Sequence, residues 1–279
     1  MRWCRLGAAV IAAAAGMPGL ACAGSAATPS APISHSGDVV QTPLALAGRL
    51  AAADAALRAS LQGWRTSDPS LLTPPPAAAL TAAATERDIV HHLAQDPRLA
   101  RRTLAALPPH LTAAIGADVL AARRLRRLTG APTTARLRLV PPRPAGELLA
   151  DYRQAQTRFG TRWQLLAAVN LVESAFGRVV NRSSAGAQGP MQFLPSTWRA
   201  YGLGGNIDAP RDAILAAANY LHQSGAPAND RGALHAYNPS RLYVDAVLTY
   251  ARQMTRDRLA YLIYYTWEAS LPATLGGSG

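Results

Sequence analysis

The residue of this sequence best suited to proton chemistry is Glu173, the one acid in a largely apolar run over residues 165–176. At helical spacing it shares a face with Leu166, Val169 and Phe176. Burial disfavours a carboxylate, and so does the partial negative charge at the C-terminus of a helix. Both effects raise the pKa, and a carboxyl group that keeps its proton near neutral pH can act as a general acid.

A competing interpretation is structural, because a Glu at such a position is more often a helix cap or the buried partner of an arginine. Arg178 and Arg182 follow Glu173 closely and are the candidate partners. Only the residues further along the chain distinguish the two interpretations.

Those later residues carry groups that suit a neutral sugar. The loop over 183–193 combines small residues with two amides and one thioether, in the order SSAGAQGPMQF. Its Gly186 and Gly189 allow a backbone to approach a ligand closely. Further on, Ala236-Tyr237-Asn238 places a phenol ring beside an amide. Neutral amides and aromatic faces suit a ligand with hydroxyl and acetamido groups, such as a carbohydrate, better than they suit a phosphate.

Three motifs, in this order and spacing, resemble the catalytic domain of the soluble lytic transglycosylase family, which shares the goose-type lysozyme fold: Glu173-Ser174, Gly189-Pro190-Met191-Gln192-Phe193 and Ala236-Tyr237-Asn238. The three motifs together are specific, whereas any one alone is not. The resemblance covers about residues 145–254 and departs from the family pattern at Pro190, often Leu, and at Ala175, often a larger residue. It implies a mainly α fold, with a lysozyme-like helical catalytic domain after an N-terminal helical region.

The resemblance also implies an activity, the cleavage of peptidoglycan glycan strands between N-acetylmuramic acid and N-acetylglucosamine to leave 1,6-anhydro ends. By position, Glu173 is the acid and then the base. The residues implied to line the substrate site are Ser174, Ser184, Met191, Gln192, Tyr237 and Asn238.

The residue types agree with a mechanism that uses one acid. Ordinary glycosidases use two carboxylates, but no second acid lies in the helix of Glu173 or in the loop over 183–193. The six histidines have no ligand spacing, so neither a metal nor a cofactor is expected. Three alternatives stay open: a hydrolytic muramidase, a non-catalytic wall-binding protein, and a helical nucleic-acid binder that uses Arg123 to Arg127.

Apolar periodicity and capping residues predict the elements that position these groups. We expect helices over 44–64, 77–107, 109–129, 145–159, 161–176, 196–201, 210–224, 230–237 and 241–254, with either strand or helix over 259–267. Thr161 and Gln164 form a capping box, and Gly130, Gly160 and Gly177 end helices. The expected organisation is a signal peptide over 1–23, a disordered tether over 24–43, a helical region over 44–139, the catalytic domain over 140–269 and a tail over 270–279.

The first residues indicate export, with a basic start, an apolar stretch over Leu6–Ala15 and the cleavage pattern Ala21-Cys22-Ala23. Lipidation at Cys22 is the alternative, so we expect a secreted or envelope-associated protein. The second cysteine, Cys4, also lies in this segment, so no disulfide is expected in the mature chain.

All 28 basic residues are Arg and the net charge is +12, which suits anionic cell-wall polymers as further partners. Export counts against nucleic acid, and a monomer is expected.

Overall fold

The computed structural model describes residues 42–129 and 137–272. The predicted signal peptide, nearly all of the tether, Gly130 and the last seven residues lie outside these ranges. Within them the chain is mainly α, as predicted. The helices of the described residues are α2 (Pro43–Ser67), α3 (Ala77–Gln95), α4 (Pro97–Ala105), α5 (Pro109–Thr129), α6 (Ala145–Phe159), α7 (Trp163–Ser174), α8 (Pro195–Tyr201), α9 (Pro210–Gln223), α10 (Asp230–Tyr237), α11 (Arg241–Arg256) and α12 (Ala260–Ala269). None of them is both long and apolar enough to cross a membrane.

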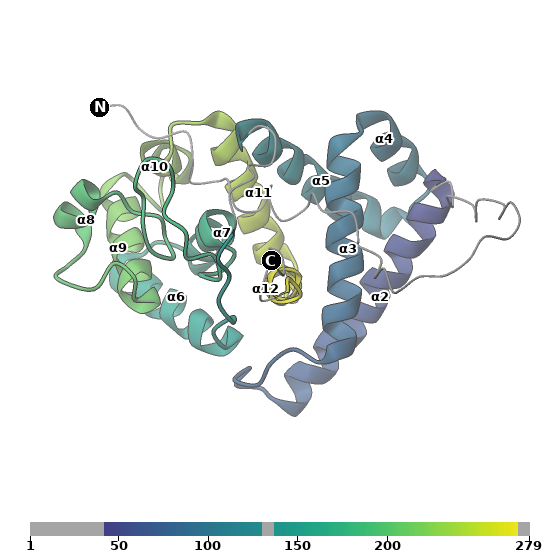
Figure 1. Ribbon diagram of the computed structural model, residues 1–279, viewed down its shortest axis with the longest axis horizontal. Helices are drawn as coiled ribbons and strands as arrows, with labels where there is room; N and C mark the ends of the chain where they lie inside the picture. Colours follow the sequence, from purple (N-terminus) through teal and green to yellow (C-terminus); the bar gives the residue numbers. More distant parts are fainter. Residues whose placement is uncertain (1–41, 130–136, 273–279) are drawn as a thin grey trace, which may run out of the picture.

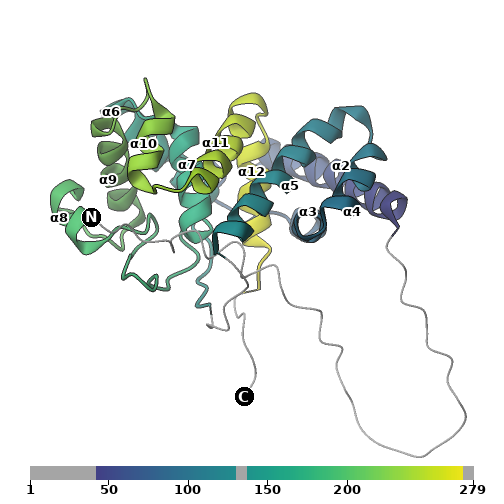
Figure 2. The same cartoon turned by 90° about the horizontal axis from the view of Figure 1, so that it is seen from above.

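The helices form two groups that meet at α11 and α12. Figure 1 shows α2 to α5 on one side and α6 to α10 on the other, with α11 and α12 between them, and Figure 2 shows the same division from above. One continuous hydrophobic core runs through both groups, from Leu46 on α2 to Trp267 on α12. The domain boundary at residue 140 stays a prediction, but the two parts share a core rather than a flexible joint.

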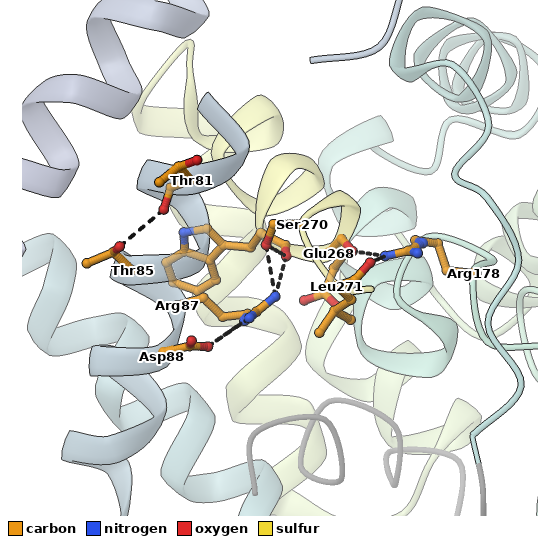
Figure 3. Close-up of polar contacts among 9 residues, drawn as sticks. Thr81, Thr85, Arg87, Asp88, Arg178, Glu268, Ser270 and Leu271 are labelled. Carbon is orange, nitrogen blue, oxygen red and sulfur yellow. Dashed lines mark hydrogen bonds and ion pairs between the residues drawn. The ribbon is translucent and has the colours of Figure 1, made fainter. Parts of the chain in front are cut away.

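Helix α12 fastens the two groups together at its C-terminal end. Arg87 of α3 donates to the carbonyl of Trp267 and to Ser270 Oγ, both at 2.9 Å. From the other group, Arg178 donates to the carbonyls of Glu268 and Leu271. Figure 3 shows these two arginines approaching the end of α12 from opposite sides. The carbonyls that a helix C-terminus leaves without partners are thereby satisfied from both parts of the fold.

The structure corrects several sequence predictions about helix ends and decides one that was left open. The expected helix over 77–107 is two helices, because Asp96 caps α4 through Oδ1 and Pro97 cannot continue α3. Helix α2 begins at Pro43, inside the expected tether, where Thr42 caps it. The stretch that could have been a strand is helix α12.

The predicted capping box before α7 is also wrong. Thr161 Oγ1 donates to the carbonyl of Ala218 at 3.0 Å and is therefore engaged with α9. The first amide of α7, from Trp163, is instead satisfied by Gln156 Oε1 at 2.7 Å, across the turn from α6. Gly160 ends α6 as predicted, with φ +73°.

Candidate active site

Glu173 lies in the last turn of α7, a helix that is buried on every side. All residues from Leu165 to Ser174 are buried, so the helix is a central core helix and not an amphipathic one with a single apolar stripe. It ends two residues earlier than predicted, because Ala175 and Phe176 both take left-handed φ values, 53° and 59°. The amide of Ala175 returns to the carbonyl of Leu171 and closes the helix.

Burial sets the protonation state of Glu173. The residue is 2 % exposed, and burial raises the pKa of its carboxyl to about 8, although a hydrogen bond from Tyr243 opposes the rise. Neither Arg178 nor Arg182 forms an ion pair with it, and Arg178 is instead engaged with the end of α12. At neutral pH the group is therefore mostly a neutral acid.

Tyr243 holds this acid in place. Its hydroxyl donates to Glu173 Oε1 at 2.7 Å, and its side chain is fully buried on α11. Burial also raises the pKa of Tyr243 well above its usual value, so the phenol keeps its proton and remains a donor. The other carboxyl oxygen, Oε2, has no hydrogen-bond partner in the described protein. Tyr243 thus fixes one oxygen, and the other is buried without a hydrogen bond.

A pocket with an empty volume of about 490 Å³ opens beside Glu173. Glu173 is the only acid in its lining, and no other charged residue lines it. Its lining residues are Glu173, Ser183, Ala187, Gln192, Phe193, Leu194, Thr197, Tyr220, Tyr237 and Asn238. The site thus combines one protonated acid with neutral polar groups and rings.

Aromatic side chains form one wall of this pocket. The Tyr237 ring meets Phe193 and Tyr220 edge to face, at centroid distances of 5.9 and 5.5 Å. Phe193 in turn contacts Trp198, at 5.5 Å. The Tyr237 hydroxyl donates to the carbonyl of Met191 at 2.5 Å, which fixes the ring against the loop. Such rings offer the apolar faces against which sugars pack.

Three of the residues implied to contact substrate line this pocket. Gln192 and Tyr237 do, and so does Asn238, the C-cap of α10. Gln192 has a left-handed φ of 48°, and its amide nitrogen donates to the carbonyl of Gly189 at 3.0 Å. The loop therefore presents this side chain at the pocket in a conformation that non-glycine residues rarely adopt.

The other three implied residues do not line the pocket. Ser184 is exposed, and its neighbour Ser183 takes the place in the lining. Met191 is fully buried and contributes its carbonyl to Tyr237 rather than its side chain to the pocket. Ser174 is also fully buried. Substrate contact by these three residues stays a prediction, although burial of Ser174 and Met191 keeps their side chains out of the lining.

Ser174 has a clear structural role instead. Its hydroxyl donates to the carbonyl of Pro190 and accepts from the amide of Gly177 at 2.9 Å. Asn170, one turn earlier, donates to the same Pro190 carbonyl at 2.7 Å and accepts from the Tyr152 hydroxyl at 2.6 Å. These bonds join α7 to the loop that carries Gln192 and so fix the distance between the acid and the opposite wall.

The glycines of the loop serve the loop itself. A Cβ on Gly189, whose φ is +70°, would lie 2.0 Å from the carbonyl oxygen of Ile207. Glycine at this position permits a close approach of the backbone at Ile207. The sequence had suggested that it permits the close approach of a ligand. Gly186 has φ +84° and nothing within 4 Å of the position of a Cβ, so only its conformation requires glycine.

Sequence reasoning missed Tyr243 and the aromatic residues Tyr220 and Phe193 as part of the site. Phe193 was in a recognised motif, but nothing in the local pattern separates Tyr243 from the other tyrosines. The only available signal was chemical, because a buried carboxyl requires a hydrogen-bond donor.

Within the described residues, no group of three His, Cys, Asp or Glu side chains could hold a metal ion.

Comparison with known families places this site in context. Residues 152–258 match the family described as the transglycosylase SLT domain. The matched segment contains Glu173, the loop over 183–193, Tyr237 and Tyr243, whereas α2 to α5 and α12 lie outside it. No match to a curated protein or to a solved structure was found.

Proposed function

We propose that the transglycosylase SLT domain carried by residues 152–258 of this chain is a lytic transglycosylase that cleaves the glycan strands of peptidoglycan. The bond cut is the one between N-acetylmuramic acid and N-acetylglucosamine. The observation that carries the proposal is one buried, protonated carboxyl in a neutral pocket with no second carboxylate. Classical retaining and inverting glycosidases need two.

Glu173 acts first as the acid. Its carboxyl proton passes to the glycosidic oxygen while the bond from C1 to that oxygen breaks, and the N-acetylglucosamine side leaves as an alcohol. We assign this proton to Oε2, because Oε1 accepts from Tyr243 and Oε2 is buried without a hydrogen-bond partner in the described protein. The N-acetyl oxygen of the substrate stabilises the positive charge at C1, a task for which the pocket offers no second carboxylate.

Glu173 then acts as the base. The carboxylate takes the proton from the C6 hydroxyl of the muramyl residue as its oxygen bonds to C1, which gives the 1,6-anhydro ring. The proton lost in the first step is regained in the second, so no water is consumed. The Tyr243 hydroxyl stabilises the carboxylate between the two steps, because a hydrogen bond to a charged acceptor is stronger than one to a neutral acceptor.

The remaining lining residues bind and orient the sugar. The rings of Tyr237 and Phe193 offer an apolar wall, and the amides of Gln192 and Asn238 offer hydrogen bonds without charge. A neutral, largely aromatic pocket suits an N-acetylated sugar and excludes water from the carboxyl group, which keeps its pKa raised.

The test is mass analysis of the soluble products from purified peptidoglycan. Anhydromuramyl ends support the proposal, whereas products heavier by one water for each cut would make the enzyme a hydrolytic muramidase. Glu173→Gln should lose cleavage but still bind glycan. The matched control is Glu268→Gln, since Glu268 is also buried but does not line the pocket. Full activity of Glu173→Gln would show that Glu173 is not the catalytic acid. A parent protein that binds peptidoglycan without releasing any cleavage product would make a wall-binding protein the better description.

We further propose that the chain is exported by residues 1–23 and acts in remodelling of the cell wall. The basic start and the Ala21-Cys22-Ala23 pattern support export. Mass analysis of the mature N-terminus distinguishes the two routes: a chain that begins at Gly24 indicates clean cleavage, and a lipid-modified Cys22 indicates an anchor. A retained Met1 in the cytoplasm would contradict both.

A further inference from the structure

A second concave site lies at the end of α7 opposite Glu173. Its empty volume is about 990 Å³, against about 490 Å³ for the pocket beside Glu173. Its walls are the start of α7, the beginning of α10 with the two residues before it, and one face of α11. Arg162 lines it, eleven residues before Glu173, so the two sites are about 16 Å apart along the helix axis. The groove is not part of the active site.

Four arginines line this groove, which we call the basic groove: Arg162, Arg231, Arg252 and Arg256. They come from three different elements, and the only acid among the lining residues is Asp230. An accumulation of guanidinium groups in a concavity raises the local positive potential more than the same charges on a convex surface, because the low-dielectric walls focus the field.

Two of these arginines are already neutralised. Arg162 forms an ion pair with Asp230, and Arg231 forms one with Asp245 at 2.8 Å. Arg252 and Arg256 form no ion pair within the described part of the chain, and both are exposed. The groove therefore keeps two cations free for a ligand, while the other two are held by their ion pairs.

The spacing indicates what the free cations would bind. Arg252 and Arg256 are four residues apart on α11, so they lie on the same face, about 6 Å apart along the axis. The part of α11 that lines the groove, from Leu248 to Arg256, is about 12 Å long. That length accommodates more than one anionic group, so the geometry suits a chain with repeated charges better than a single ion.

The floor and the walls favour phosphate over carboxylate. Leu248, Ala251 and Leu165 are largely buried and form the apolar part of the lining. The four guanidinium groups come from three elements around one groove, so a tetrahedral phosphate, whose oxygens point in several directions, can accept from more than one of them. A planar carboxylate presents its two oxygens in one plane and matches a single guanidinium fork.

We propose that the basic groove is a binding site for a phosphate-bearing polymer, separate from the glycan site and independent of the reaction at Glu173. Such a site would hold the enzyme beside anionic polymers while the pocket beside Glu173 acts on a neutral strand. Its contribution is to retention at the substrate and not to the chemical step.

The test measures binding of linear tripolyphosphate to the whole protein by calorimetry, with poly-glutamate of matched charge as the carboxylate probe. The double variant Arg252→Gln/Arg256→Gln should lose about tenfold in tripolyphosphate affinity, because each exposed charge contact contributes modestly. It should keep its activity on short soluble glycan fragments. The dependence of binding on salt should also weaken in the variant, because fewer counterions are released.

The matched control is Arg101→Gln/Arg102→Gln, which removes the same charge from two exposed arginines of α4. Helix α4 packs on α2, α3 and α5, in the other half of the molecule. Its tripolyphosphate affinity should change less than twofold. An equal loss in the two double variants would reduce the effect to net charge and overturn the site. Poly-glutamate binding as tightly as tripolyphosphate would overturn the assignment to phosphate.

Discussion

Replacing Glu173 by Gln should abolish cleavage and at the same time stabilise the fold at neutral pH. The side chain is 2 % exposed, and burial raises the pKa of its carboxyl from 4.5 to about 8. The folded state thus holds the proton more tightly than the unfolded chain. This contribution to stability is complete below pH 4.5 and is lost progressively as the pH rises to about 8.

The size of the effect follows from that window. Each pH unit between the two pKa values costs about 1.4 kcal/mol, so the free energy of unfolding is lower by on the order of 3 kcal/mol at pH 7 than it would be with a neutral group. Gln keeps an acceptor for the Tyr243 hydroxyl and carries no charge. Its amide adds one buried donor without a partner, which costs about 1 kcal/mol. The expected net gain at pH 7 is therefore about 2 kcal/mol.

The assay is urea unfolding of both proteins between pH 4.5 and 8.5, with turbidity loss of purified peptidoglycan as the activity readout. The stability gap should be small or reversed near pH 4.5 and should widen up to pH 8. Asp208→Asn makes the same chemical change at an exposed acid and should show no such trend. Two results would refute a buried neutral acid: a Glu173→Gln protein that is less stable than the parent at pH 7, or a stability difference that does not depend on pH. Either result would favour a Glu173 that is folded as a carboxylate with a structural role.

Three further substitutions test other parts of the argument. Tyr243→Phe removes the hydrogen bond that lowers the pKa of Glu173. The alkaline limb of the pH profile of kcat/KM should therefore move up by about half to one pH unit. The control Tyr250→Phe, on the same helix, should leave this limb in place. Gly189→Ala should cost more than 2 kcal/mol in urea unfolding, because its Cβ would meet the carbonyl of Ile207 as well as adopt a positive φ, whereas Gly186→Ala should cost only about 1 kcal/mol. Burial raises the pKa of Asp118 to about 7, so Asp118→Asn should gain stability over the parent as the pH rises from 4 to 7, by at most about 4 kcal/mol.

Each of these outcomes has a contrary result. An alkaline limb that stays in place or falls in Tyr243→Phe would show that Glu173 is not the group being titrated. Equal costs for the two glycine substitutions would show that the contact with Ile207 is not tight. A stability of Asp118→Asn that falls relative to the parent at higher pH would show that Asp118 is folded as a carboxylate paired with Arg58.

The mainly α fold and most helix positions could be predicted from local signals. Gly160 ends α6 and Pro195 and Pro210 begin helices, because each of these residues acts through its own backbone. The predictions failed where a distant partner decided the end. Thr161 turned to Ala218 on α9, and Gln156 of the preceding helix supplied the cap. Such choices depend on packing that no local window contains.

The site divides in the same way. The sequence by itself identified Glu173 as an acid in apolar surroundings and named Gln192, Tyr237 and Asn238, because their motifs combine unusual residue types at close spacing. It could not determine which side chains of a motif face the cavity. The left-handed backbone at Gln192 and the hydrogen bonds of Ser174 made that choice, through contacts between residues far apart in the chain.

Tertiary structure alone decided the electrostatics. The sequence suggested a raised pKa for Glu173 from a helix end and one apolar face, but the principal cause is burial of α7 on every side by α11, α12, α6 and α9. The tertiary structure also placed Tyr243, seventy residues later in the chain, against Glu173 Oε1. It brought four arginines from three elements into one groove. A pKa or a field is set by everything within a few ångströms, and only the folded chain determines what those neighbours are.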